Sequence, residues 1–342
     1  MLRSLYAGIS GMKVNQVKLD VIGNNIANVG TTAFKSSRVR FQDMVSQSMS
    51  DASASSANTG GVNPKQIGLG VQVAGIDTMV GQGMMQPTSR NLDVAMDGEG
   101  YLIVGSGPID GKITVNATHT MDAQTGKILS TSYTRDGALT LDDAGHLLTS
   151  DGFRVMGYSV TGDNAAGTAG TVQSLVYDTT TGKLTTVFVD ANGANAPKAS
   201  ANLVPLSIPA KIGATGSEQR VRTFSIEKDG TIKAVLEDGS VSVVGQIAMA
   251  SFNNPAGLSK VGKNLYKNTS NSGEPVVRSG LKATDDNSAG YGDMLSGMLE
   301  MSNVDLAEQF TDMIVASRAF QANGKTITTG DEILQEILAL KR

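Results

Sequence analysis

Mostly apolar residues recur at alternating spacings of three and four at both ends of the chain. In the first segment these positions are Leu2, Leu5, Ile9, Met12, Gln16, Leu19, Gly23 and Ile26. In the last segment they are Leu306, Phe310, Met313, Ser317, Phe320, Gly324, Ile327, Asp331, Leu334 and Leu338. This spacing is the heptad repeat of α-helices that pack along one stripe. The pattern predicts one helix from Leu2 to Ile26 and a second over residues 302–342.

Local signals mark the ends of both predicted helices. The asparagine-rich run 24–30 consists of poor helix formers and ends the first helix. Residues 302–305, followed by Glu308, predict a capped start for the second helix. Gly324 and Gly330 weaken the middle of this helix by about 1 kcal/mol each relative to Ala. We therefore expect fraying or a bend there.

Between the helices the period changes to short β runs separated by turn dipeptides. The dipeptides are Asp97-Gly98, Asp136-Gly137, Asp151-Gly152, Asp229-Gly230 and Asp238-Gly239. The predicted strands are 101–104, 138–141, 146–149, 184–189, 221–226, 231–236 and 241–244. Asp-Gly between β-prone runs is typical of hairpins. The middle of the chain is therefore predicted to be all-β, which makes the fold class mixed.

Composition supports this picture and narrows the function. The 342 residues include 40 Gly, only 4% aromatics and no Trp, which favours turns and aliphatic cores. The net charge of -4, with scattered basic residues, indicates neither nucleic acid nor membrane as a partner. The chain has no Cys, which excludes thiol catalysis and disulfides. The first residues lack the apolar region of a cleaved signal peptide, so the residues alone favour a soluble protein.

Candidate chemistry is sparse. The chain has two histidines, His119 and His146, which have no partner at metal-ligand spacing and are interpreted as strand surface residues. The cluster from Asp142 to Gly145 lacks the ladder of a calcium loop and is interpreted as a hairpin turn. The glycines of 67–71 complete no phosphate-binding motif. We therefore predict no enzyme activity, no cofactor and no metal site.

The two terminal stripes have two possible uses. An amphipathic helix usually covers the core of its own domain. These stripes, however, lie at the extreme ends of the chain beside the polar segment 46–63, and a lone helix as short as the first is marginal in water. We therefore predict that they pack against other copies of the chain in an open helical filament. This predicted assembly seam comprises Leu2, Leu5, Ile9, Met12, Leu19, Ile26, Leu306, Phe310, Met313, Phe320, Ile327, Leu334 and Leu338.

Both ends also carry longer motifs. Ser10-Gly-Met12, followed by Asn24-Asn-Ile-Ala-Asn28-Val-Gly-Thr-Thr-Ala-Phe-Lys35, resembles the N-terminal signature of the bacterial flagellar rod and hook axial proteins. Ala33 stands where this family often has Gly. The runs 299–308, 317–323 and 331–338 resemble the matching C-terminal end. The core of the family motif is Asn24, Asn25, Ile26, Ala27 and Asn28.

Within the family, residues 63–71, 92–97 and 133–158 are similar to hook subunits, and the segment from about Ser159 to Arg222 resembles the outer domain of a hook. The resemblance implies three layers. A coiled-coil layer holds residues 1–30 and 302–342, and a linker spans 31–70. A discontinuous middle β domain comprises 71–158 and 224–301, and an inserted outer β domain comprises 159–223.

The implied function is a structural subunit that polymerises into the flagellar hook, a flexible tubular joint that transmits torque from rod to filament. The resemblance further implies contacts with distal rod, hook cap and hook–filament junction proteins, and type III export to the flagellum, outside the cell, without a cleaved signal peptide. Two alternatives remain open at this point. They are a distal rod protein of the basal body and, in another class, a secreted β-rich carbohydrate-binding protein.

Overall fold

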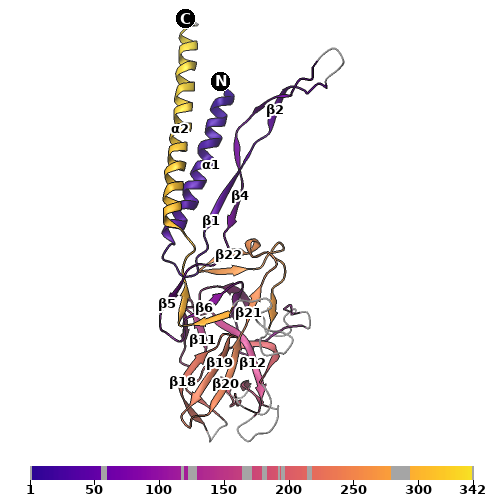
Figure 1. Cartoon of the computed structure of the whole chain (residues 1–342), viewed down its shortest axis with the longest axis vertical. Coiled ribbons are helices and arrows are strands. Elements are labelled where there is room, and N and C mark those ends of the chain that lie inside the picture. Colours follow the sequence, from indigo (N-terminus) through magenta and orange to yellow (C-terminus); the bar gives the residue numbers. More distant parts are fainter. Residues whose placement is uncertain are drawn as a thin grey trace. The chain divides into compact units, whose positions relative to one another are not determined.

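The computed structural model describes residues 2–54, 60–116, 119–121, 129–163, 172–178, 183–191, 193, 197–213, 218–278 and 293–340. These residues form two compact units (Figure 1). The helical unit comprises residues 1–30, 35–80 and 303–342, and the β unit comprises residues 31–34 and 81–302. The structure is thus mostly β with a helix at each end, as the sequence predicts at this level.

The helical unit contains both predicted helices, α1 (Leu2–Ala27) and α2 (Leu306–Ala339). The side chain of Asp305 caps α2, because its Oδ1 accepts from the backbone N–H groups of Ala307 and Glu308 at 2.8 and 3.3 Å. The expected fraying is not seen, since α2 continues through both glycines. No helix among the described residues is long and apolar enough to cross a membrane.

Two β ribbons complete the helical unit. Strand β1 (Ser37–Asp43) pairs antiparallel with β4 (Val71–Thr78), and β2 (Ser46–Ser50) pairs antiparallel with β3 (Lys65–Gly68). The structure thus differs from the expected linker over 31–70 and from a β domain beginning at residue 71. The physical reason is that strands pair through backbone hydrogen bonds, which form whatever the side chains are. A segment rich in Ser and Gln is predicted to be a linker from its composition alone, yet it can still pair as a strand.

The β unit is built on one branched sheet of 16 strands among the described residues. Its longest path runs β17-β18-β19-β20-β12-β7-β9-β23-β22. The elements of the unit are β5 (Met85–Pro87), β6 (Val94–Asp97), β7 (Tyr101–Ser106), β8 (Ile113–Thr114), β9 (Ser130–Thr134), β10 (Leu139–Leu141), β11 (Leu147–Thr149), β12 (Arg154–Gly162), β13 (Val172–Gln173), β14 (Leu175–Asp178), β15 (Lys183–Thr186), β16 (Lys198–Pro205), β17 (Lys211–Ile212), β18 (Gln219–Ile226), β19 (Thr231–Leu236), β20 (Val241–Ile247), β21 (Met249–Ser251), the 3-10 helix η1 (Pro255–Gly257), β22 (Ser259–Gly262), β23 (Leu265–Lys267), β24 (Val276–Arg278), β25 (Asp293–Ser296) and β26 (Met298–Glu300).

Each of the seven predicted strands overlaps an observed one, namely β7, β10, β11, β15, β18, β19 and β20. Gly230 and Gly239, with φ of 79° and 86°, form the turns that join β18 to β19 and β19 to β20, as Asp-Gly dipeptides predict. Gly137 serves a different purpose. A Cβ there would lie 1.6 Å from the carbonyl oxygen of Val94, so this glycine permits close backbone contact.

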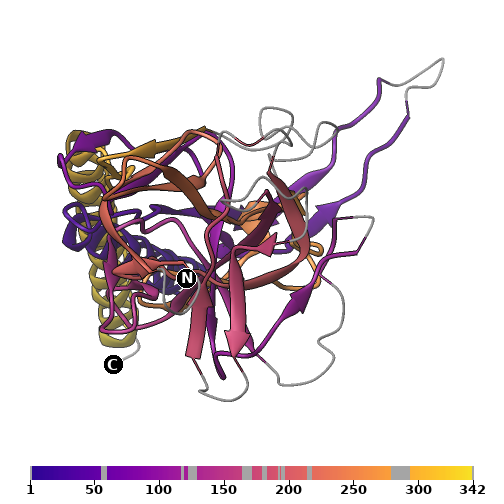
Figure 2. The same cartoon turned by 90° about the horizontal axis from the view of Figure 1, so that it is seen from below.

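The inserted segment 159–223 does not separate from the rest of the β unit. Strand β12 runs through residue 159 and pairs with β7, β16 and β20. Figure 1 labels β12 beside β20, and Figure 2 shows the strands of the β unit from below. Leu203 from β16 shares a buried cluster with Ile103 and Tyr133. The expected outer domain therefore shares a sheet and a core with the expected middle domain in this structure. Residues 164–170, which contain only Asn, Ala, Gly and Thr, lie outside the described residues.

Candidate assembly surface

The helices α1 and α2 run antiparallel and pack against one another. Near the end of α1, Asn25 Nδ2 donates to Gln309 Oε1 at 3.0 Å. About two turns earlier in α1, Lys18 Nζ forms an ion pair with Asp312 Oδ1 at 3.2 Å. Toward the start of α1, Gly8 lies against Ile327. Residues progressively earlier in α1 therefore contact residues progressively later in α2. The two helices are antiparallel, as Figure 1 shows.

Small residues let the two helices approach closely. A Cβ built at Gly11 would lie 2.6 Å from Asn323 Nδ2, and one built at Gly330 would lie 2.8 Å from Leu5 Cδ2. The contact between the helices thus depends on Gly8, Gly11 and Gly330 and on amide side chains as much as on large apolar ones. These residues give no apolar signal in the sequence.

The family motif ends α1 and holds the next strand. Asn25 is only 1% exposed, and its amide bonds both backbone groups of Ser37, accepting from N–H at 3.0 Å and donating to C=O at 2.9 Å. This side chain therefore takes the place of a neighbouring β-strand at the start of β1. Asn28 Nδ2 donates to the carbonyl oxygen of Asn24 at 2.9 Å and closes the helix end. Ile26 is half-buried, and Ala27 is exposed.

A second asparagine, Asn303, also binds backbone groups of distant segments through its side-chain amide, a role that the sequence did not indicate. Its Oδ1 accepts from the backbone N–H of Ser36, and its Nδ2 donates to the carbonyl oxygen of Met79, both at 2.8 Å. The predicted cap of α2 over residues 302–305 includes Asn303, whereas the residue that caps the helix is Asp305. An asparagine two residues before an N-cap is the only local signal, and it does not reveal the distant partner.

The assembly seam is not buried within the helical unit. None of its residues with a described side chain is buried; the side chain of Leu2 lies outside that set. Phe310 is 50% exposed and Phe320 38% exposed. The remaining exposed members are Ile9, Leu306 and Leu338, and the half-buried members are Leu5, Met12, Leu19, Ile26, Met313, Ile327 and Leu334.

The seam residues of both helices face the same way. An α-helix turns about 100° per residue, so the middle of the seam on each helix lies roughly a quarter turn or less from the side that contacts the other helix, and the seam residues Leu5 and Ile327 lie in that contact, against Gly330 and Gly8. Viewed from the N-terminus of each helix, the rotation from the contact side to the seam has the same sense in α1 and in α2. Because the two helices run in opposite directions, equal rotations place both seams on the same side of the helix pair. Together they form one apolar face two helices wide.

Four further exposed large apolar residues of α2 lie outside the predicted seam. They are Ile314, one turn after Phe310, and Val315, Ile333 and Ile337, which lie farther around the helix from Phe310. The heptad count assigns one stripe to a helix, so it missed all four. The last three recur at spacings of eighteen and four residues.

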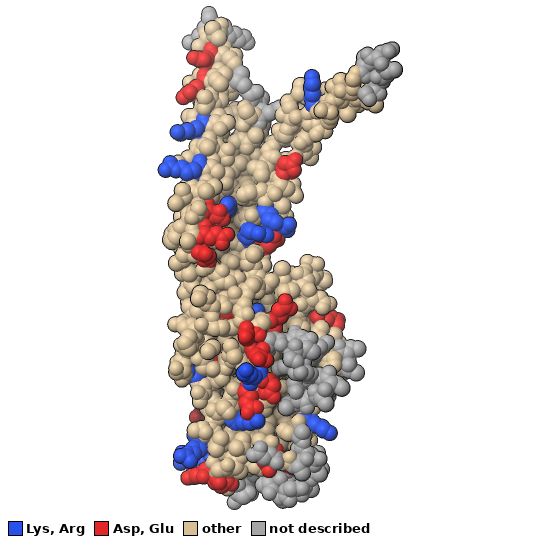
Figure 3. Space-filling model, viewed as in Figure 1, with Lys and Arg blue, Asp and Glu red and all other residues tan. Residues whose placement is uncertain are grey.

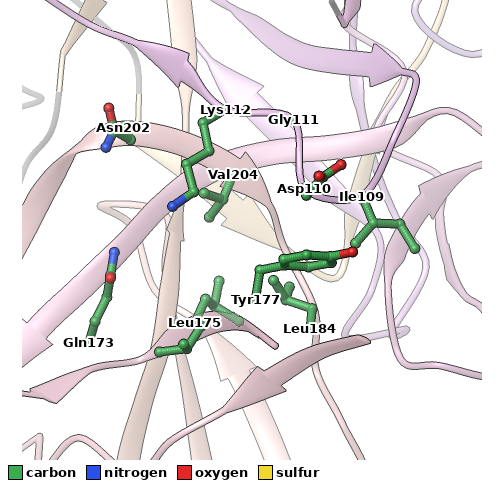
Figure 4. Close-up of a pocket in the computed structure, with 11 residues that line it drawn as sticks. Ile109, Asp110, Gly111, Lys112, Gln173, Leu175, Tyr177, Leu184, Asn202 and Val204 are labelled. Carbon is green, nitrogen blue, oxygen red and sulfur yellow. The ribbon is translucent and has the colours of Figure 1, made fainter. Parts of the chain in front are cut away.

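The β unit offers little chemistry. One cavity of about 90 Å³ lies beside the β14–β15 hairpin, where Tyr177 and Leu184 meet Asp110 and Lys112 of the loop before β8 (Figure 4). It is well below the roughly 300 Å³ of a typical small-molecule pocket. Two larger depressions, of about 550 Å³ beside Met294 and about 790 Å³ beside Phe224, are open to the surface. No group of three or more His, Cys, Asp or Glu side chains suited to a metal occurs among the described residues.

The interpretation of the two histidines as strand surface residues was wrong. His146 is buried, and burial lowers the pKa of its imidazole below the ordinary value. His119 lies half-buried in a loop with φ of 61°. The expected hairpin turn at Asp142 is present, since Asp142 Oδ1 accepts from the N–H of His146 between β10 and β11.

Charged side chains on the face shown in Figure 3 lie in small groups of both signs.

Comparisons with known proteins place these features in a family. The model "Flagella basal body rod protein" matches residues 5–35, "Flagellar hook protein FlgE/F/G D1 domain" matches residues 95–234, and "Flagellar basal body rod FlgEFG protein C-terminal" matches residues 295–340. The chain is 41% identical over 342 residues to the flagellar basal-body rod protein FlgG of Bacillus subtilis, with 100% of each chain covered. The chain belongs to the family of flagellar rod and hook proteins. The resemblance seen in the terminal motifs is thereby confirmed.

Other members of this family are hook proteins by name. The chain is 31% identical over 468 residues to the flagellar hook protein FlgE of Borreliella burgdorferi, again with 100% of each chain covered. A crystal structure of the flagellar hook protein FlgE2 of Helicobacter pylori matches 63% of this chain and 100% of that one, with 12% identity and a TM-score of 0.38.

Proposed function

We propose that this chain is the subunit of a flagellar hook, and that copies of it polymerise through the assembly seam into a tube. The observation that carries the proposal is the apolar face formed by α1 and α2, whose members stay exposed or half-buried in the single chain. Fully burying a Phe or Leu side chain contributes about 1.5–3 kcal/mol. Burying the exposed halves of several such side chains is therefore a substantial driving force for association.

The same face accounts for the mechanical role of a joint. Sliding two packed apolar faces past one another re-exposes surface at roughly 25 cal/mol per Å², so the layer of terminal helices resists torsion. Contacts made by the β units would be more polar and would slip more easily. Such a tube transmits torque while it bends. The expected coiled-coil layer is part of this proposal.

The proposal includes the setting of the tube. The subunit is exported by the flagellar type III apparatus without a cleaved signal peptide and assembles outside the cell. At its ends the polymer contacts distal rod, hook cap and hook–filament junction proteins. The chain has no catalytic role.

A direct test replaces one seam residue. Phe310→Asp puts a charge into the face and should abolish polymers of the purified full-length chain in electron micrographs, while circular dichroism stays that of a folded protein. Lys325→Asp is the matched control, because Lys325 is exposed on the side of α2 away from the seam and from α1. Polymers of normal amount from Phe310→Asp would refute the proposal.

The second candidate is the distal rod, and the 41% identity to a protein named as FlgG favours it. Support for the hook comes from the full-length match to FlgE and from the similarity of residues 133–158 to hook subunits. Micrographs of tubes grown from the purified chain distinguish the two. A hook gives curved tubes, and a rod gives straight, rigid ones.

A further inference from the structure

The strand β18 has one edge that no strand covers along most of its length. On one side β18 pairs with β19. On the other side β17 pairs only with Gln219 and Arg220, and among the described residues no further strand pairs with that side. The N–H of Val221 still donates to the carbonyl oxygen of Ala210 at 3.0 Å. Residues 222–225, which we call the open edge, follow without a neighbouring strand.

The backbone of Phe224 presents hydrogen-bonding groups on the open edge. Its carbonyl oxygen accepts from Nδ2 of Asn91, a residue in the turn before β6, at 3.4 Å, so this carbonyl points away from β19. In an antiparallel ladder the N–H and the C=O of one residue point to the same side. The N–H of Phe224 therefore points outward too. Outward backbone groups on a sheet edge are the template on which another extended chain pairs.

A surface depression of about 790 Å³ lies beside the open edge. Its volume falls within the roughly 300–1,000 Å³ of protein binding sites. Apolar side chains contribute to its lining, namely Leu141, which is 37% exposed, and the half-buried Val221 and Phe224. An extended segment along β18 would place alternate side chains on this apolar lining while its backbone pairs with Phe224.

The charges around the depression favour a basic segment. Lys211 and Glu218 form an exposed ion pair at 3.8 Å, so their charges offset one another. Asp142 and Asp143 lie together in the β10–β11 turn, and Asp143 is exposed and has no ion pair among the described residues. The remaining charge, Arg222, is on β18 itself. A Lys or Arg of an incoming segment is therefore attracted to the turn.

We propose that the open edge and its depression bind a short, extended, basic segment of another protein, which adds to β18 as a strand. The segment pairs with the backbone of Phe224 and places a Lys or Arg beside Asp143. At 3.4 Å per residue the open edge spans about 14 Å, and the bulge between Val221 and Thr223 disfavours longer pairing. The segment therefore pairs over about four residues. All of these groups belong to the β unit, so the inference does not depend on the assembly seam.

The test titrates the full-length chain into a short, blocked, fluorescein-labelled peptide in which Val and Lys alternate, and follows fluorescence anisotropy. Saturable binding is expected. Methylating alternate backbone nitrogens of the peptide gives two variants, and the one methylated on the side that faces β18 should lose binding while the other keeps it. Asp143→Lys should weaken binding by at least about threefold, as should Glu in place of Lys in the peptide. Glu274→Lys is the matched control, because Glu274 is exposed in the β unit and does not line the depression.

Hydrogen exchange then locates the bound peptide. Amides of residues 219–227 should exchange more slowly in its presence, in the wild type and in Glu274→Lys. If both methylated peptides bind as well as the parent, or if exchange in this segment does not change, strand addition to β18 is wrong. If Asp143→Lys binds with unchanged affinity while its circular dichroism stays normal, the preference for a basic segment is wrong. If the peptide dissociates dimers of the chain in analytical ultracentrifugation, a second copy occupies the open edge and the proposal is overturned. None of these failures affects the formation of tubes, so they are distinguishable from a failure of the proposed function.

Discussion

A buried ion pair joins distant segments of the β unit, and its removal has a calculable cost. Arg135 Nε lies 3.0 Å from Glu300 Oε2, and the two side chains are 4% and 0% exposed. Glu300 Oε1 also accepts from the backbone N–H of Gly83 at 2.8 Å, and Arg135 donates to the carbonyl oxygen of Gly98. The guanidinium lies 5.8 Å from the ring centroid of Tyr101. Glu300 thus ties β26 to residues 81–84 and to the main sheet.

Replacing one partner of the ion pair leaves the other partner's charge buried and unpaired. Arg135→Met leaves the Glu300 carboxylate buried without a counter-ion, and breaking a buried pair in this way costs about 3–5 kcal/mol. Because Met fills much of the volume of Arg, most of this cost is electrostatic. Adding Glu300→Gln removes the second charge, so the double variant should recover a large part of the loss. The coupling free energy between the two sites is expected to exceed about 1 kcal/mol.

The assay is urea unfolding followed by near-ultraviolet circular dichroism. The chain has no Trp, and the tyrosines Tyr101, Tyr133 and Tyr266 are buried in the β unit, so the signal reports that unit. The control is Lys211→Met, which removes an exposed ion pair with Glu218 at 3.8 Å and should cost at most about 1 kcal/mol. The reasoning is refuted if Arg135→Met is no more destabilising than Lys211→Met, or if the two sites are additive.

Three further predictions concern single residues. Asn25→Leu removes the two hydrogen bonds between the Asn25 amide and the backbone of Ser37 and should cost about 2–6 kcal/mol, at 1–3 kcal/mol per bond, seen as a fall in the thermal midpoint of the helical signal. An unchanged midpoint would contradict the role assigned to Asn25. Asp305→Ala removes the cap of α2 and should cost about 1 kcal/mol in urea unfolding, while Asp305→Asn, which keeps the acceptor, should cost clearly less. Burial raises the pKa of Tyr101 and of Tyr133 to about 12, above the ordinary value of 10.0, so the unfolded state loses these protons first. Stability should be unaffected by these groups below pH 10 and fall above it by about 1.4 kcal/mol per pH unit per tyrosine, and replacing both by Phe should flatten that slope in alkaline urea titrations.

The sequence was informative where a pattern is long and local. Both helices follow from a heptad repeat sustained over whole segments, and the Asp-Gly turns located the hairpins of β18, β19 and β20. The contact between α1 and α2 could not be read in the same way. It uses Gly11, Asn323 and Gln309, which become contacts only when the two ends of the chain meet.

Domain boundaries were the weakest inference for a related reason. A polar, Ser-rich stretch reads as a linker by composition, yet β2 and β3 pair through backbone groups that composition does not report. Likewise, nothing local at residue 159 shows that β12 continues and joins β16 and β20. The tasks of Asn25 and Asn303 also depend on partners far away in the sequence.

The most direct measurement of the central claim uses the absence of Cys from the chain. Ser317→Cys places one thiol on the seam stripe of α2, and Lys325→Cys places one on its exposed polar side. In the monomer both thiols should react with a soluble maleimide. In the assembled tube the thiol at 317 should become protected while the one at 325 stays reactive. Equal reactivity of the thiol at 317 in monomer and tube would contradict the claim that other copies of the chain cover this face.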